Sequence, residues 1–309
     1  MSNGAGDRRP GDWSAAIEHL VGLGQRAGAQ WEAGWNEIAT YVRQRLTGSY
    51  EVDEFGHDAE FTDRIWLPLT RALAQNWFHC ETRGVENLPR TGPAMLVSNH
   101  AGSLPVDGMV LQSVVHDETG RLTRMLGADL LFRTPFTGTL ARRTGTTLAC
   151  QSDAARLLAA GHLVTVFPEG FKGPGKPYTQ RYKLQRFGRG GFVATAIAAG
   201  VPIIPVAVVG SEEIYPNLAN APGLARLFGL PHFPITPTFP WLGPLGAIPL
   251  PAKWIIGFGA PVPTHELEPG AAEDPMIVFN VTDQVRESIQ HSLYALLAER
   301  GPAFRNDAV

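Results

Sequence analysis

The chain has 309 residues, a net charge of −3, 44% apolar residues and 18% charged residues. This length and apolar share allow one large α/β domain with a helical extension, or two small domains, and the charge gives no support to a nucleic-acid-binding protein. The share of charged residues lies below that of an ordinary soluble domain, which fits either a large core or a surface that rests on something apolar.

The first residues and the cysteines narrow the class of protein further. Residues 1–12 are polar, and no apolar core of a secretion signal follows them. Cys80 and Cys150 lie far apart and neither belongs to a CxxC pair, so we expect no zinc site, no disulfide framework and a reducing compartment. No stretch reaches the ~18 continuous apolar, helix-competent residues that a membrane span needs. We therefore expect a protein that does not cross the membrane, although it can lie on one.

Two amphipathic segments rich in tryptophan come first in the chain. Residues 13–46 predict a helix because apolar residues recur at spacings of three and four, and residues 47–60 read as a polar, acidic linker. A second helical pattern covers 61–78, with Pro68 interrupting it. Tryptophan and basic residues favour the boundary between water and lipid. These helices are therefore either interfacial anchors or ordinary helices packed on the domain.

From residue 94 onward, short apolar strands alternate with helical patterns. The predicted strands are Ala94–Ser98, Arg124–Ala128, Thr146–Ala149, His162–Phe167, Pro202–Val209 and Trp254–Phe258. The predicted helices cover residues 105–115, 135–143, 152–160, 190–199 and 276–300. Repeated β-then-α units indicate an α/β fold with a mainly parallel sheet flanked by helices, whose sites lie at the carboxyl ends of strands. We expect this domain over residues 61–305, after an N-terminal amphipathic helical extension and linker over 1–60.

Residues 227–252 form a segment of unusual composition. They contain no Asp, Glu, Lys or Arg, and they hold seven prolines. Proline at that density excludes a continuous helix, and with it a membrane span. We expect a long apolar loop region that shapes an acyl tunnel or dips into a bilayer surface, or else a rigid loop packed on the core.

His100 and Asp107 form the first candidate chemical group. His100 follows a predicted strand, and Asp107 lies just inside a predicted helix, because Pro105 suits the first turn and Ser103 can cap it. The electropositive helix start favours an ionised Asp107, and Gly102 lets the loop fold back so that the two side chains meet. Asp107 would then orient the imidazole, which becomes a general base toward a hydroxyl. The alternative is an ordinary histidine near an ordinary aspartate at a helix start.

A second candidate group begins at Glu169, in the run Phe-Pro-Glu-Gly. This run ends a predicted strand, so Glu169 would lie at the carboxyl edge of the sheet, on the same side as His100. The next acidic residue is Glu212. Six cations lie between the two glutamates: Lys172, Lys176, Arg181, Lys183, Arg186 and Arg189. Positive charge without any acid predicts an anion site for phosphate on an acceptor, on coenzyme A or on lipid head groups, unless the loop is only a solvated basic segment.

Taken together, these blocks resemble the glycerophospholipid and lysophospholipid acyltransferase superfamily, the PlsC-like group. The resemblance covers roughly residues 65–260 and keeps the order of the blocks. The similar blocks are Gly84–Pro89, Asn99-His100 with Asp107, Leu131-Phe132-Arg133, Phe167–Gly170 and Val201–Pro205. The superfamily usually has His-x4-Asp, whereas this chain has His-x6-Asp, which is similar to the branch of monoacylglycerol and diacylglycerol acyltransferases. Phe171 and Lys172 stand where the family usually has Thr-Arg, and lysine lacks the planar fork that grips phosphate through two bonds.

The resemblance implies direct transfer of a fatty acyl group from acyl-CoA or acyl carrier protein to a hydroxyl of a glycerolipid acceptor such as lysophosphatidate. His100 would act as general base and Asp107 would orient it, without a metal or a cofactor. The residues implied to bind substrate are Asn99, Arg133, Glu169, Gly170, Lys172, Lys176, Arg181, Lys183 and Arg186. We expect a cytoplasmic protein that lies peripherally on the inner face of the membrane and binds no nucleic acid.

Other classes of protein account for less of the sequence. A serine esterase or lipase needs an activated serine, and the chain has no Gly-x-Ser-x-Gly elbow. A lipid-binding protein without catalysis explains the tryptophan-rich helices and the basic loop but gives no reason for His100 and Asp107. A nucleotide-binding enzyme would need the Gly-x-x-x-x-Gly-Lys-Ser/Thr loop, which the chain does not contain.

Overall fold

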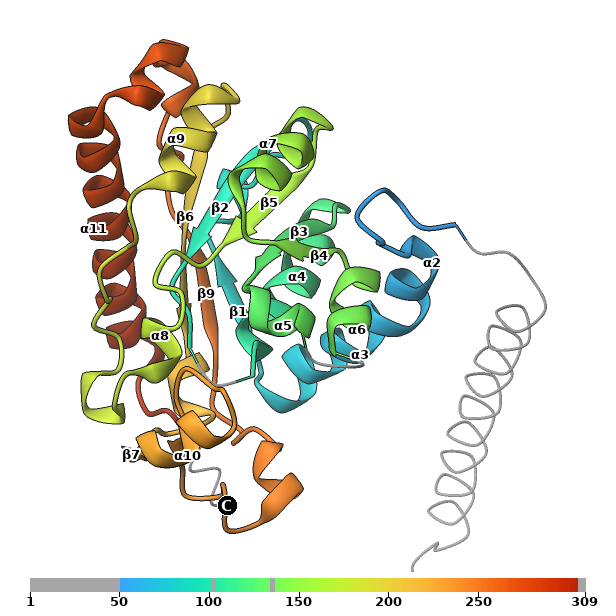
Figure 1. Cartoon of the computed structure of the whole chain (residues 1–309), viewed down its shortest axis with the longest axis vertical. Helices are drawn as coiled ribbons and strands as arrows, with labels where there is room; N and C mark the ends of the chain where they lie inside the picture. The colour runs from blue at the N-terminus through green and yellow to red at the C-terminus, as the bar shows by residue number, and fades with distance from the viewer. Residues whose placement is uncertain (1–50, 102–103, 134–136, 305–309) are drawn as a thin grey trace, which may run out of the picture. The chain divides into compact units, whose positions relative to one another are not determined.

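The computed structural model describes residues 51–101, 104–133 and 137–304 (Figure 1). The predicted helix over 13–46, the loop residue Gly102, the capping residue Ser103 and the start of the predicted helix over 135–143 lie outside these ranges. The predicted extension over 1–60 is therefore described only from residue 51 onward, and its boundary with the domain stays a prediction.

A seven-stranded sheet forms the centre of the described chain. Its strands, in order across the sheet, are β1 (Glu81–Arg83), β9 (Ile255–Phe258), β6 (Ile203–Val209), β2 (Ala94–Ser98), β5 (Leu163–Val166), β3 (Thr123–Gly127) and β4 (Thr146–Leu148). Neighbouring strands are parallel except for the antiparallel pair β6 and β9. The predicted mainly parallel sheet is therefore confirmed, and the predicted strands have the right bounds to within one residue.

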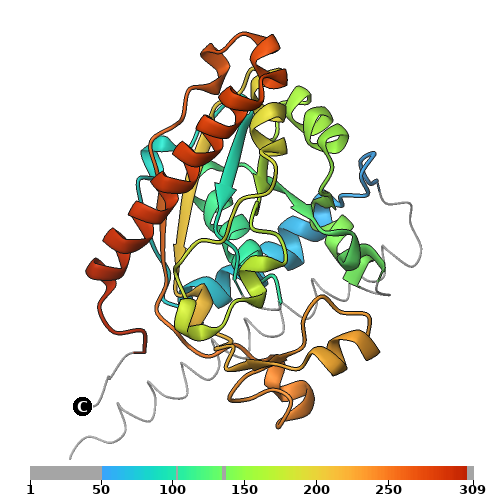
Figure 2. The same cartoon turned by 60° about the vertical axis from the view of Figure 1, so that its left-hand side comes forward.

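Helices cover both faces of this sheet (Figures 1 and 2). On one face lie α4 (Val106–Thr119) and the helix from Ala59 to Trp77; on the other lie α7 (Gln151–Ala159), α9 (Gly191–Ala198) and α11 (Pro275–Arg300). The remaining helical segments are α5 (Asp129–Arg133), α6 (Thr137–Arg143), α8 (Lys172–Gly175), α10 (Pro222–Leu227) and the 3-10 turns η3 (Val85–Asn87), η4 (Tyr178–Gln180), η5 (Ser211–Glu213), η6 (Gly243–Ala247), η7 (Thr264–Glu266) and η8 (Pro269–Glu273).

Two hydrophobic cores lie on the two faces because side chains alternate along each strand. On β2, Met95 and Val97 join the core under α7, α9 and α11, whereas Leu96 joins the core under α4. All seven residues of β6 are buried, as expected for an apolar strand covered on both faces. The continuous apolar runs that predicted these strands thus reflect a sheet buried on both sides.

The helix predicted over 61–78 forms as one continuous run from Ala59 to Trp77. Its parts are α2 (Ala59–Phe61), η1 (Thr62–Trp66), α3 (Leu67–Ala72) and η2 (Leu73–Trp77), of which η1 and η2 are π-helical. Pro68, predicted to interrupt the helix, lies at the start of α3. The turn before Pro68 is π-helical, because the Leu67 N–H donates to Thr62 O, five residues back rather than four. This change in the hydrogen-bonding pattern accommodates proline, which has no N–H to donate.

A buried hydrogen bond joins this helix to α4. Trp66 Nε1–H donates to Gln112 Oε1 at 2.8 Å, and the Gln112 amide nitrogen donates to Thr123 O and Thr144 O. At Trp66 the helix therefore packs as an ordinary part of the domain, one of the two interpretations left open by the sequence.

We expect Trp66→Phe to lower the free energy of unfolding by about 1–3 kcal/mol, because it leaves the buried Gln112 oxygen without a donor. Urea unfolding followed by circular dichroism measures the effect. The control is Leu69→Gln on the same helix, where the side chain is exposed and we expect a change within about 0.5 kcal/mol. Equal stability of Trp66→Phe and the wild type would contradict a structural role for this bond.

The described part of the predicted linker contacts the sheet. Phe55 is buried in the core under α7 and α9, and Asp53 accepts a hydrogen bond from the buried Arg124 at 2.6 Å. Among the described residues, none of the helices combines the length and the hydropathy that crossing a bilayer requires.

The predicted apolar loop region over 227–252 is mostly irregular, with η6 and the short strand β8 (Pro234–Ile235) inside it. β8 pairs with β7 (Ala219–Asn220) in a separate two-stranded sheet, and α10 lies between them. The sequence did not predict β1, β7, β8, α5 or α10, all of which have six residues or fewer.

Candidate active site

Three neighbouring strands end at one edge of the sheet and carry the candidate residues into one place. β2 leads into Asn99 and His100, β5 leads into Glu169, and β6 leads into Glu212. β2 lies between β5 and β6, and all three are parallel. The loops that follow them therefore meet at the carboxyl edge, where α/β sheets place their sites.

His100 and Asp107 are in direct contact. His100 Nδ1 lies 2.7 Å from Asp107 Oδ2. The same oxygen accepts the Ala101 N–H at 2.8 Å, and Asp107 Oδ1 accepts the Gly108 N–H at 2.8 Å. Asp107 is fully buried at the start of α4, whereas the His100 side chain is 20% exposed. The carboxylate thus fixes the ring through Nδ1, so that Nε2 is the nitrogen that can face a substrate.

The surroundings of His100 make its ring a stronger base than an ordinary histidine. Burial lowers the pKa of His100, but the charge and hydrogen bond of Asp107 and the charge of Glu169 outweigh it, so the pKa is raised overall. The charge of Lys176 acts in the opposite direction. Phe167 packs against the imidazole with ring centroids 4.6 Å apart, which shields one side of the ring. Such a ring can accept a proton from a hydroxyl and hold it as an imidazolium.

Asn99 ties the end of β2 to the neighbouring strand. Its Nδ2 donates to Val208 O at 3.0 Å, and its Oδ1 accepts the Val208 N–H at 2.8 Å. The side chain is fully buried. Asn99 was predicted to bind substrate; in the structure both ends of its amide are bonded to the backbone of Val208, and its role in the site stays a prediction.

Glu169 holds the backbone of His100 from the other side. Glu169 Oε1 accepts the His100 N–H at 3.1 Å, and Oε2 accepts the Gln185 N–H at 2.7 Å. The side chain is buried, and Gly170 follows it with a positive φ of 54° that turns the chain. The structure therefore brings Glu169 and His100 together, as the sequence predicted, through the backbone of His100.

The predicted anion-binding cations have different environments. Lys172, Lys183 and Arg186 are exposed on the loop after β5, and Arg181 lies over the Tyr178 ring at 4.5 Å. Arg133 is 74% exposed and pairs with Asp129 at 2.5 Å. Lys176 differs from all of these because it is buried and lies 2.8 Å from Glu212. Their roles in binding substrate stay predictions.

Glu212 is a member of the site that the sequence did not predict. It follows β6 and reaches the same edge as Glu169, so the signal available was its place after a predicted central strand. Burial raises the pKa of Glu212 to about 7, although the charge and hydrogen bond of Lys176 lower it. A glutamate in this state changes charge near neutral pH.

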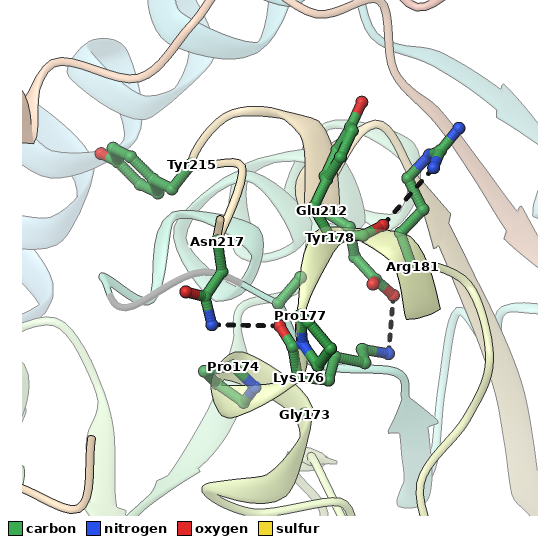
Figure 3. Close-up of a pocket in the computed structure, with 10 residues that line it drawn as sticks. Gly173, Pro174, Lys176, Pro177, Tyr178, Arg181, Glu212, Tyr215 and Asn217 are labelled. Atoms are coloured by element: carbon green, nitrogen blue, oxygen red, sulfur yellow. Dashed lines mark hydrogen bonds and ion pairs between the residues drawn. The ribbon is translucent and has the colours of Figure 1, made fainter. Parts of the chain in front are cut away.

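A small pocket lies next to the loop of His100, because Ala101 is one of the residues that line it (Figure 3). It has a volume of about 20 Å3, and its lining includes Ala101, Lys176, Tyr178, Arg181, Glu212 and Asn217. Asn217 Oδ1 is buried there and accepts no hydrogen bond from the described residues. A volume of about 20 Å3 holds little more than a water molecule, so the pocket as it stands has no room for a lipid head group or an acyl chain.

Comparisons with known proteins agree with this architecture. A family model described as Acyltransferase matches residues 79–209. An uncharacterized protein of Mycobacterium tuberculosis is 55% identical over 269 residues, which cover 86% of this chain and 75% of the relative. A Bos taurus protein named "DGAT1/2-independent enzyme synthesizing storage lipids" is 24% identical over 230 residues, covering 74% of this chain and 66% of that protein.

A solved structure shares the fold. The 1-acyl-sn-glycerophosphate (LPA) acyltransferase PlsC of Thermotoga maritima superimposes with a TM-score of 0.53 and 17% sequence identity, covering 79% of this chain and 84% of that chain. The matched family region begins before β1 and ends with β6, so it contains the strands that lead into His100, Glu169 and Glu212. The chain belongs to the glycerolipid acyltransferase superfamily.

Proposed function

We propose that the protein transfers a fatty acyl group from acyl-CoA or acyl carrier protein to a hydroxyl of a glycerolipid acceptor such as lysophosphatidate. The observation that carries the proposal is the 2.7 Å contact between His100 Nδ1 and the buried carboxylate of Asp107. This contact lies at the carboxyl edge of a mainly parallel sheet and leaves Nε2 of a partly exposed imidazole as the nitrogen available to a substrate.

In the proposed reaction, His100 Nε2 takes the proton of the acceptor hydroxyl while the hydroxyl oxygen attacks the thioester carbonyl. The tetrahedral intermediate then collapses, the carbon–sulfur bond breaks and the thiolate leaves. The proton held on His100 passes to the thiolate, so that an ester and a free thiol are the products. Asp107 stabilises the imidazolium while it carries that proton, and no redox change or covalent enzyme intermediate is involved.

The basic loop supports the anionic part of the proposal. Lys172, Lys183 and Arg186 are exposed on the loop between β5 and α9, close in sequence to Glu169. Exposed lysine and arginine side chains bind phosphate through charge-assisted hydrogen bonds. We propose that these cations hold the phosphates of coenzyme A or of the carrier's prosthetic group, and Arg181 and Arg133 are further candidates. Gly170 leaves room beside Glu169 because no atom lies within 4 Å of the place of a Cβ.

The test is an acceptor panel with the full chain. Purified protein is incubated with acyl-CoA, or with acyl carrier protein, and with lysophosphatidate, glycerol 3-phosphate, monoacylglycerol, diacylglycerol or a glycolipid. Free thiol and lipid product are both measured. We include the uncharged acceptors because the bovine relative is named for storage-lipid synthesis. Thiol release that depends on an acceptor and yields an acylated lipid supports the proposal. Release that no acceptor accelerates supports a thioester hydrolase, and absence of release supports a lipid-binding protein.

We also propose that the protein works peripherally on a membrane surface, the inner face in the cell. Many large apolar side chains are exposed on the segment that includes β7, α10 and η6, which lies beyond one end of the main sheet (Figure 1). They are Leu218, Leu224, Leu227, Phe228, Leu230, Trp241, Leu242, Leu245 and Ile248. The absence of Asp, Glu, Lys and Arg from 227–252 removes the cost of bringing charge to lipid. The same segment begins at Tyr215 and Asn217 of the pocket, so it would bring the site to the lipid.

We expect the pair of changes Trp241→Ser and Leu245→Ser to weaken binding to phosphatidylcholine–phosphatidylglycerol vesicles by about tenfold or more. Trp241 is 71% exposed, and removing apolar area worth about 1.4 kcal/mol at the interface changes a partition constant tenfold. Vesicle co-sedimentation measures the partition constant. The control pair Met276→Ser and Phe279→Ser removes equally exposed apolar side chains at the start of α11. Equal weakening by both pairs would contradict a specific membrane face.

A further inference from the structure

A buried cluster of three charged side chains lies behind the loop of His100. Lys176 Nζ lies 2.8 Å from Glu212 Oε1 and 3.6 Å from Glu169 Oε2, and it donates to Lys183 O at 3.3 Å. The side chains of Lys176, Glu169 and Glu212 are 4%, 0% and 5% exposed. In Figure 3 the Lys176 ammonium group points at the carboxylate of Glu212. The ammonium group therefore donates hydrogen bonds to Glu212 and to Lys183 O, and it lies at ion-pair distance from Glu169.

This cluster joins the three loops that build the site. Glu169 follows β5 and accepts the His100 N–H, Glu212 follows β6, and Lys176 follows α8. The segment before Lys176 is also in close backbone contact with the loop of His100. A Cβ added at Gly173 would lie only 2.5 Å from His100 O. A displacement of Lys176 would thus be transmitted to His100 through Glu169 and through this backbone contact.

The burial of Glu169 and Glu212 as carboxylates depends on the positive charge of Lys176. An isolated carboxylate is costly to bury, and removing one partner of a buried ion pair leaves an uncompensated charge. Glu169 and Glu212 are both buried and both negative when ionised, and Lys176 lies between them. Of the cations on the loop after β5, Lys176 is buried, whereas Lys172, Arg181, Lys183 and Arg186 are exposed.

We propose that Lys176 is a positioning residue for His100 and not a ligand of a substrate phosphate: its ammonium group, held between Glu169 and Glu212, fixes the loop from which His100 acts. The proposal rests on His100 being the general base of the proposed function. It assigns to Lys176 a role different from the anion binding that the sequence suggested for the whole basic loop.

The role has a kinetic consequence whose sign is fixed by the charges around His100. Those charges are Asp107 on α4, Glu169 after β5, Lys176 after α8 and His232 in the proline-rich segment. The charge of Lys176 lowers the pKa of His100. Loss of that charge therefore raises the pKa of His100, so the acid limb of the profile of kcat/KM against pH moves to higher pH.

The test compares Lys176→Met with Lys176→Arg in the full chain. For Lys176→Met we expect kcat to fall by about a hundredfold, as for a catalytic group misplaced by about 1 Å. We expect the acid limb to move to higher pH, and KM for the acyl donor to stay within about twofold because no phosphate contact is lost. Lys176→Arg, which retains the charge, should restore the acid limb and most of kcat.

Three further measurements keep the proposal falsifiable. Lys253→Met, which removes a lysine–glutamate pair elsewhere, should leave both kcat and the acid limb unchanged. If Lys176→Met does not fold, the neutral pair Lys176→Met with Glu212→Gln removes the unpaired charge and should show the same shift. Titration of the His100 ring by NMR reports its pKa without any turnover, so it tests the proposal even if every acceptor fails.

Two outcomes overturn the proposal. A raised KM with an unchanged kcat and an unchanged acid limb would make Lys176 a phosphate ligand. A lower melting temperature with the wild-type profile and the wild-type pKa of His100 would leave Lys176 a purely structural residue.

Discussion

His100→Ala is expected to reduce acyl transfer by about 10²–10⁴-fold, the range contributed by a positioned general base. Alanine removes the nitrogen that takes the proton from the acceptor hydroxyl, while the substrate pockets and the loop cations remain. The effect should fall on kcat more than on KM, because the proton transfer occurs in the transition state. Acceptor-dependent thiol release and the amount of lipid product measure it.

His291→Ala is the matched control for this change, because His291 is exposed on α11, among residues that have no place in the site. We expect it to keep the wild-type rate. Should His100→Ala retain more than about a tenth of the activity, the assignment of His100 as the general base is wrong, and another group takes the proton.

Asp107→Asn is expected to reduce kcat by about 10²–10⁴-fold as well, for a different reason. The carboxylate accepts hydrogen bonds from three groups: the His100 ring, the Ala101 N–H and the Gly108 N–H. An amide in its place has only one oxygen and presents an N–H₂ group to donors. The ring then loses the tautomer and the orientation that leave Nε2 to accept a proton.

The pH dependence separates Asp107→Asn from a general loss of structure. Asp107 raises the pKa of His100 through its charge and its hydrogen bond. Without them the pKa of His100 falls, so the acid limb of kcat/KM moves to lower pH, opposite to the direction expected for Lys176→Met. Asp117→Asn is the control, because it removes a carboxylate from the same helix that pairs with Arg71 on the surface. An acid limb unchanged in Asp107→Asn would contradict the pairing.

The sequence predicted the elements whose signal is local. β2 and β6 were predicted because they are apolar runs between turn-forming residues, and α11 because its apolar residues recur at helical spacing. The meeting of His100 and Asp107 followed from the same local information, since one residue ends a strand and the other starts the next helix. Each of these predictions depends on fewer than thirty consecutive residues.

The remaining features depend on partners far away in the chain. Lys176 is one of six cations in a loop without acids, and its burial is decided by Glu212, which reaches it only after α9 and β6 have packed. The amide of Asn99 binds the backbone of Val208, a contact that no sequence period encodes. The strands β7 and β8 have two residues each, too few for any alternation to be seen.

The order of strands in the sheet also bears on how the chain folds. β1 pairs with β9 alone, so Glu81 finds its partner Ile255 only when most of the chain has been made. The strands that carry the site, β2, β5 and β6, are complete by Val209 and neighbour one another. Long-range pairing is slow because the closure of a large loop precedes the contact. During synthesis on the ribosome, the strands that carry the site (β2, β5 and β6) can therefore pair first, and β9 and β1 are added to the sheet last.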